Sequence, residues 1–255
     1  MTTFATTHET PHSHELAHHF ESLEQQREAA ELGMWLFLAT EFMFFGGLFL
    51  AYVTYRSWYP QEFAAASATL NVTLGTLNTL VLLTSSLTMA LAVQAAHAGR
   101  RESLTWFLVA TLGLGGIFLG VKAYEYHHKY EEKHIPFAGL PFEFHAPSHA
   151  DTTSPPSVVE TTDSRRGSTN HAELLNRKGL QTFFNLYFLM TGFHALHMLI
   201  GMAILAVLVV LARRGGLRGE SSIVVHNVGM YWHLVDLVWV YLFPFLYLVA
   251  SRGSP

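Results

Sequence analysis

The chain has 255 residues and a formal charge of −4; half of its residues are hydrophobic and only 13% are charged. Ordinary globular chains carry about twice that charged fraction. The charged residues are therefore too few to cover the surface of a soluble fold of this length, and we predict a membrane protein. The lack of lysine- and arginine-rich runs argues against a nucleic-acid partner, and the absence of cysteine excludes disulfides, thiolate metal sites and cysteine nucleophiles.

Residues 1–31 form a polar segment before the first hydrophobic run. The segment holds one basic residue, several acidic residues and no apolar core, which argues against a signal peptide. We therefore expect a retained cytoplasmic tail. Five histidines near its start could bind a transition metal, although a solvated polar tail is the favoured interpretation; they are His8, His12, His14, His18 and His19.

Five apolar runs are long enough to cross a bilayer as helices, because a hydrocarbon core about 30 Å thick requires roughly 20 apolar residues in α-helix. The runs are Leu32–Tyr55, Leu70–Ala96, Leu104–Tyr126, Leu180–Ala212 and Val225–Ala250. We predict an all-α integral membrane protein with a bundle of five transmembrane helices. The first three lie within residues 32–126 and the last two within residues 180–250, and a short tail follows at 251–255.

One connection, residues 127–179, is much longer than the others. Its middle part, SHADTTSPPSVVETTDSRRGSTNH, is rich in Ser, Thr and Pro and has little apolar surface to bury. We expect this part to be flexible or to lie over a partner.

Arginines in short loops mark the cytoplasmic side of a membrane protein. Here Arg100 and Arg101 follow the second span, and Arg213, Arg214 and Arg218 follow the fourth. Both loops lie on the same side of a five-span topology. This predicts a cytoplasmic amino terminus, an external carboxyl terminus and an external long loop.

Ionisable groups within the apolar runs are functional candidates, because each costs roughly 2.5–3.5 kcal/mol to insert at bilayer depth. Glu41 lies well inside the first span, in LATEFMFFGGLF, where it cannot easily reach the membrane surface. We expect it to be protonated or paired with a donor from another helix. Two interpretations are equally open: a carboxylate that exchanges protons or contacts a partner, and a structural hydrogen bond between helices.

Two pairs of polar residues recur at a spacing of three, which places each pair on one helix face. His194 and His197 could bind a metal, but no larger ligand set accompanies them, so interhelical or lipid-headgroup hydrogen bonding is favoured. His233 and Asp236 could form a carboxylate-oriented imidazole, either in a proton relay or, as we favour, in a polar clamp to a neighbouring helix. Trp232 beside them is an interface anchor or a packing residue.

Lys122 and Glu125 lie one turn apart near the outer end of the third span. An ion pair there would lower the cost of both charges, although a simple span boundary is the favoured interpretation. Small residues elsewhere in the spans favour close helix contacts. Polar residues of the second span can hydrogen-bond across helices; these are Asn78, Thr79, Ser85 and Ser86.

Taken in order, five segments resemble the haem-copper oxidase subunit III family, which includes subunit III of cytochrome c oxidase and its quinol oxidase relatives. The segments are GMWLFLATEFMFFGGLFLAY, LNTLVLLTSS, KAYEY, TGFHALHMLIG and YWHLVDLVWVYLF. The resemblance covers residues 32–250 without the middle of the long loop. Members usually have seven helices, and the spans here resemble the last five, as in the five-helix branch of the family.

The resemblance extends to individual positions. Glu41 matches a buried carboxylate of the family, and Arg213 lies near a basic position used for lipid headgroups. His197, His233 and Asp236 match recurrent polar positions. The proton-related or buried polar candidates are Glu41, His194, His197, His233 and Asp236, and the lipid-binding candidates are His197, Arg213 and Trp232.

The family implies a non-catalytic accessory subunit of a respiratory terminal oxidase in the bacterial inner membrane. Members pack against the catalytic subunit I, assemble with subunit II and further subunits, hold structural phospholipids, and support proton uptake and sustained turnover during oxygen reduction. We therefore expect no metal, cofactor or catalytic centre in this chain, with haem and copper in partner subunits. The electron donor of the complex is either cytochrome c or quinol.

Three alternatives stay open. A sister branch of the family associates with nitric oxide reductase. An independent proton-conducting membrane protein would use Glu41, His194 and Asp236 as its path. A membrane metalloenzyme would use His194 and His197 as metal ligands.

Overall fold

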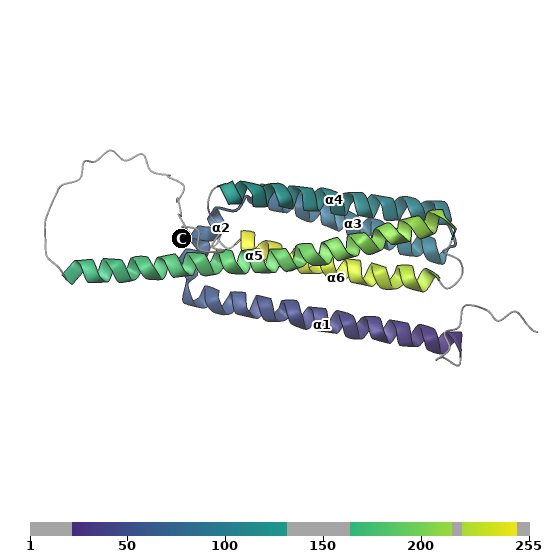
Figure 1. Cartoon of the computed structure of the whole chain (residues 1–255), viewed down its shortest axis with the longest axis horizontal. Helices are drawn as coiled ribbons and strands as arrows, with labels where there is room; N and C mark the ends of the chain where they lie inside the picture. The colour runs from purple at the N-terminus through teal and green to yellow at the C-terminus, as the bar shows by residue number, and fades with distance from the viewer. Residues whose placement is uncertain (1–21, 132–163, 216–220, 249–255) are drawn as a thin grey trace, which may run out of the picture. The chain divides into compact units, whose positions relative to one another are not determined.

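The structure, a computed structural model, describes residues 22–131, 164–215 and 221–248, and all regular structure within them is helical (Figure 1). The helices are α1 (Leu23–Trp58), α2 (Pro60–Ala68), α3 (Val72–His97), α4 (Arg101–Glu131), α5 (Ser164–Arg213) and α6 (Ser221–Tyr247). The histidines of the amino-terminal tail, the middle of the long loop and the tail at 251–255 lie outside the described residues.

Five of these helices are long and apolar enough to cross a membrane, which confirms the predicted fold class. The candidate spans are Glu24–Trp58, Val72–His97, Arg101–His127, Arg177–Arg213 and Ser222–Tyr247. In a bilayer no water is present to pair with exposed amides and carbonyls, so a long apolar run satisfies them within its own helix. The orientation of the termini stays a prediction.

Several helices extend past the apolar runs. α1 begins at Leu23, α4 continues to Glu131 and α5 begins at Ser164, so parts of the predicted tail and of the predicted long loop are helical. The start of α1 has a local cause. The Ser22 hydroxyl accepts a hydrogen bond from the Gln25 amide at 3.2 Å, which is the arrangement of a serine N-cap.

The short helix α2 was not predicted from hydrophobicity. Pro60 suits its first position, because the proline ring fixes φ near the helical value and its missing N–H has no partner there anyway. α2 packs against α5 and α6 and buries Phe63 and Ser67. The Ser67 hydroxyl donates a hydrogen bond of 2.7 Å to the carbonyl of Leu246. The last carbonyls of a helix lack helical partners, so α2 caps the end of α6.

By its internal contacts the chain divides into residues 1–41 and residues 42–255. The second unit contains a bundle in which α3, α4, α5 and α6 lie side by side (Figure 1). α3 and α5 each contact both α4 and α6.

Large aromatic side chains fill the interior of this bundle; fully buried examples are Phe118, Phe183, Tyr187, Trp232, Trp239 and Tyr247. Glycine permits the closest approach between two helices. A Cβ atom on Gly229 of α6 would lie 2.8 Å from the Val93 side chain of α3. The bundle therefore combines buried aromatic side chains with close helix contacts at small residues. Such packing is expected in a membrane, because the hydrophobic effect does not drive helices together in apolar lipid and van der Waals contacts must do so.

Candidate functional site: buried polar groups and a basic pocket

A buried ion pair with two tyrosine hydroxyls joins α4, α5 and α6. Lys122 donates to Glu125 at 2.7 Å, so the ion pair is present although a simple span boundary was the favoured interpretation, and the two residues are only 5% and 7% exposed. The other carboxylate oxygen of Glu125 accepts hydrogen bonds from the Tyr247 hydroxyl at 2.6 Å and the Tyr187 hydroxyl at 3.0 Å. The Lys122 ammonium also lies 4.4 Å from the centre of the Trp239 ring, within cation–π range.

The two tyrosines were not identified from the sequence. They lie 62 and 122 residues away from Glu125, on other helices, and nothing in the local pattern distinguishes them from other tyrosines of the spans. Their hydroxyls occupy lone pairs of Glu125 that Lys122 leaves free. A buried ion pair needs such additional hydrogen bonds to offset its loss of hydration.

His194 and His197 are neighbours on α5, but their rings contact different helices. His194 is 1% exposed, and its ring centre lies 5.6 Å from Phe118 of α4 and 5.3 Å from Trp239 of α6. The His197 ring lies 5.2 Å from Phe45 of α1, and its Nδ1 donates to a backbone carbonyl one turn earlier. The structure thus gives the two imidazoles separate surroundings.

His233 and its neighbour Trp232 join α6 to α3. His233 Nδ1 and the Ser86 hydroxyl share a hydrogen bond of 2.7 Å, and Trp232 Nε1 donates to the Ser85 hydroxyl at 3.1 Å. This is the kind of contact that the clamp interpretation predicts. No hydrogen bond joins His233 to Asp236, so the structure does not pair these two residues. The Ser86 hydroxyl, which bonds to His233, also interacts with the Asp236 carboxylate. Trp232 is fully buried, which leaves no exposed surface on it for a lipid headgroup.

Glu41 lies in α1 and is half-buried. It belongs to the unit of residues 1–41, whereas the other four polar candidates belong to the second unit.

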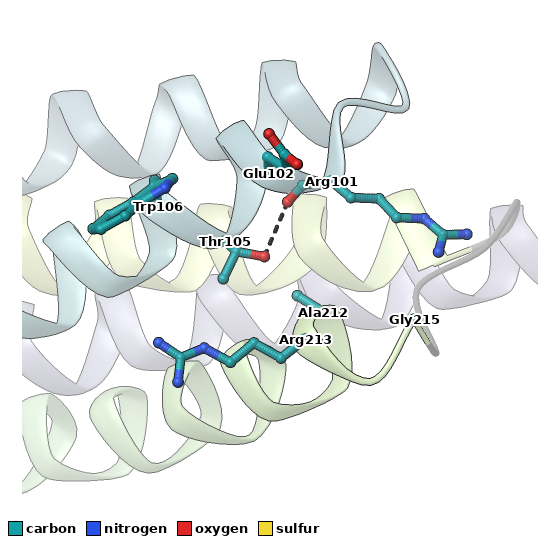
Figure 2. Close-up of a pocket in the computed structure, with 7 residues that line it drawn as sticks. All are labelled: Arg101, Glu102, Thr105, Trp106, Ala212, Arg213 and Gly215. Carbon is teal, nitrogen blue, oxygen red and sulfur yellow. Dashed lines mark hydrogen bonds between the residues drawn. The ribbon is translucent and has the colours of Figure 1, made fainter.

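A basic pocket of about 610 Å³ lies between the start of α4 and the end of α5 (Figure 2). Its lining residues are Arg101, Glu102, Thr105, Trp106, Ala212, Arg213 and Gly215. In Figure 2 the side chains of Arg101 and Arg213 extend from different helices and in different directions, so the pocket holds two separate positive charges. The Thr105 hydroxyl donates to the Arg101 carbonyl at 2.9 Å. Arg213 is a predicted lipid contact, and the tertiary fold places Arg101 in the same pocket.

Comparison with known proteins assigns a family. The sequence profile described as cytochrome c oxidase subunit III matches residues 13–131 and 180–251. The chain is similar to a cytochrome c oxidase subunit 3 of Thermostichus vulcanus, with 28% identity over 223 residues, 86% of this chain and 87% of the relative. It is also similar to a probable quinol oxidase subunit 3 of Staphylococcus aureus strain USA300, with 23% identity over 92% of this chain and 96% of the relative. The chain belongs to the cytochrome c oxidase subunit III family.

Proposed function

We propose that this chain is the non-catalytic third subunit of a respiratory haem-copper oxidase in a bacterial inner membrane, where it packs against subunit I and assembles with subunit II and further subunits. The observation that carries the proposal is the family match, which includes residues of all five candidate membrane spans. Relatives named as subunits of cytochrome c and of quinol oxidases align over most of the chain.

The polar interior supports an accessory role. Lys122, Glu125 and His233 form contacts between helices, and such contacts stabilise a bundle. The haem and copper of the complex would lie in partner subunits, and this chain would contribute a surface, bound lipid and a favourable environment for proton uptake.

Purification through this chain in mild detergent tests the assembly. We expect co-purification of an oxidase subunit I with haem absorbance in the reduced-minus-oxidised spectrum, together with subunit II on mass identification. Recovery of the intact chain, free of haem and of any oxidase subunit, would contradict the proposal.

The basic pocket supports a role in holding phospholipid. Arg101 and Arg213 provide positive charge, and the adjacent start of α4 adds the positive end of a helix dipole. Trp106 is 74% exposed beside them, and tryptophan is enriched at the membrane–water interface. The pocket therefore suits the phosphate of an anionic phospholipid whose chains run along α4 and α5.

A pair of double variants tests this lipid role. Arg101→Gln/Arg213→Gln removes both positive charges of the pocket and leaves Glu102, whereas Arg100→Gln/Arg214→Gln removes two neighbouring arginines that do not line it. We expect the first variant to lose phosphatidylglycerol in native mass spectrometry of the complex and the second to retain it. Equal retention in both variants, or equal loss, would contradict a headgroup site in the pocket.

Glu41 is the candidate for support of proton uptake, because it is the carboxylate inside the first span and matches the family position. We expect Glu41→Gln to leave the complex assembled and to shorten the period over which it sustains oxygen consumption. Gel analysis of subunit retention and an oxygen electrode measure the two effects. Loss of the subunit from the complex would indicate a structural clamp, and unchanged retention with unchanged turnover would contradict both roles.

A further inference from the structure

An imidazole lies at the surface of the bundle near the middle of the membrane. His233 is half-buried on α6 beside α3, and it lies near the centre of the 26-residue span Ser222–Tyr247. At 1.5 Å per residue, it lies roughly 16 Å from the nearer end of that span. This depth is close to the centre of a hydrocarbon core about 30 Å thick, so the ring cannot reach water at either membrane surface.

The two nitrogens of the His233 ring have different surroundings. Nδ1 shares a hydrogen bond of 2.7 Å with the Ser86 hydroxyl, which also interacts with the Asp236 carboxylate. Nε2 forms no hydrogen bond with the described residues, and it is not one of the unpaired polar atoms that the bundle encloses, so it opens to the surface. A neutral imidazole has one nitrogen that donates and one that accepts, so Nε2 needs a partner in either tautomer.

Other polar side chains on this surface are satisfied within their own helix. The exposed Thr76 and Thr84 hydroxyls of α3 each donate to a carbonyl one turn earlier, at 2.9 Å. Nε2 of His233 has no such bond to α6. Hydrocarbon chains offer neither donor nor acceptor, and ionisable residues at this depth are almost always paired. The partner of Nε2 must therefore come from outside the described chain.

The side chains that flank His233 on this surface are apolar. Leu237 follows His233 by one turn of α6 and is 45% exposed, and Leu83 precedes Ser86 by one turn of α3 and is 50% exposed. Gly229, one turn before His233, lets α6 approach α3 closely. The two helices therefore present one apolar surface with a single polar atom near mid-depth, which suits packing against another helix.

We infer that this surface, defined by Leu83, Ser86, His233 and Leu237 and here named the His233 face, packs against a transmembrane helix of subunit I that presents a hydroxyl or carboxamide side chain to His233 Nε2. Hydroxyl and carboxamide groups both donate and accept, so they fit either tautomer of the ring. The leucines supply van der Waals contact, and the hydrogen bond fixes the depth of the partner helix. The inference rests on the proposed assembly with subunit I and names the face that makes it.

Site-specific photocrosslinking in the oxidase complex tests the inference. The photoreactive residue p-benzoylphenylalanine replaces Leu237 or, as the control, Ile117, which is 53% exposed near the middle of the α4 span. α4 and α6 each pack between α3 and α5, so position 117 lies across the bundle from position 237. We expect an adduct with subunit I from position 237 and none from position 117.

The other outcomes of the crosslinking decide against the inference. Adducts with subunit I from both positions or from neither, or an adduct of position 237 with a second copy of this chain or with lipid alone, would overturn it. If subunit I co-purifies without an adduct at position 237, only the His233 face is contradicted. If no oxidase subunit co-purifies, the proposed assembly fails as well.

Two substitutions separate the outward bond of His233 from its bond to Ser86. His233→Gln places an amide near the position of Nε2, whereas His233→Asn places one near Nδ1. On detergent titration followed by native gels, we expect His233→Gln to stay in the complex like the parent and His233→Asn to be released several-fold more readily. Equal release, or greater release of His233→Gln, would overturn the role of Nε2. Should neither variant assemble, the crosslinks made with His233 in place still decide the inference.

Discussion

The hydroxyl of Tyr247 donates a hydrogen bond of 2.6 Å to the carboxylate of Glu125, across 122 residues of sequence. This bond fixes the end of α6 against the part of α4 that holds the buried ion pair. It also explains how charge is accommodated in an apolar bundle, since the carboxylate has donors on both of its oxygens. The group of Lys122, Glu125, Tyr187 and Tyr247 forms only when α4, α5 and α6 are in register. We therefore expect the effects of substitutions at these residues on the free energy of unfolding to be non-additive.

Loss of one member of the ion pair should be more harmful than loss of both. Lys122→Met leaves a buried carboxylate without its counter-charge, and breaking a buried pair in this way costs about 3–5 kcal/mol. In the double variant with Glu125→Leu no buried charge remains. We expect its free energy of unfolding, from denaturant titration in detergent, to exceed that of Lys122→Met. Additive losses from the two substitutions would contradict the coupling.

Gly229 should tolerate no larger side chain. A Cβ atom there would lie 2.8 Å from Val93, and valine has little rotamer freedom to move away. Overpacking costs about 1–3 kcal/mol and should exceed the gain of about 1 kcal/mol in helix propensity. We expect Gly229→Ala to lower the melting temperature of the purified protein. Gly113→Ala, with no atom within 4 Å of its Cβ, is the control and should not lower it.

Capping of α6 by α2 should contribute measurably to stability. Ser67→Ala leaves the buried Leu246 carbonyl without the Ser67 donor, at a cost of about 1–3 kcal/mol. Ser57→Ala removes an exposed hydroxyl that bonds only within α1, and its effect should stay within about 0.5 kcal/mol. Unfolding titrations of both variants give the comparison. Similar small effects would show that Ser67 does not cap α6.

The orientation can be measured directly, because the chain has no cysteine and each introduced thiol is unique. The predicted topology places α2 outside and the turn between α3 and α4 in the cytoplasm. We expect Gln61→Cys to react with a membrane-impermeant maleimide in intact cells. Ala98→Cys should react only after permeabilisation. The reverse pattern would show that the amino terminus is external.

The sequence predicted the spans well, because an apolar run satisfies its own backbone in lipid whatever its neighbours are. It also offered the Lys122–Glu125 ion pair, as the less favoured interpretation, because their spacing brings both groups together on one helix. Its prediction was less complete at α2, where a short helix has no long apolar run to indicate it. The exact helix ends depend on local caps such as Ser22, which hydropathy does not register.

Hydropathy by itself determined that the chain is a five-span helical membrane protein. The order of the motifs along the sequence indicated the subunit III family. Only the tertiary structure decided that Glu125 meets Tyr187 and Tyr247, that His194 and His197 contact different helices, and that Arg101 and Arg213 line one pocket. The physical reason is that a transmembrane helix can be apolar on every side. Its rotation and depth are then set by packing against other helices, and these determine which polar groups meet.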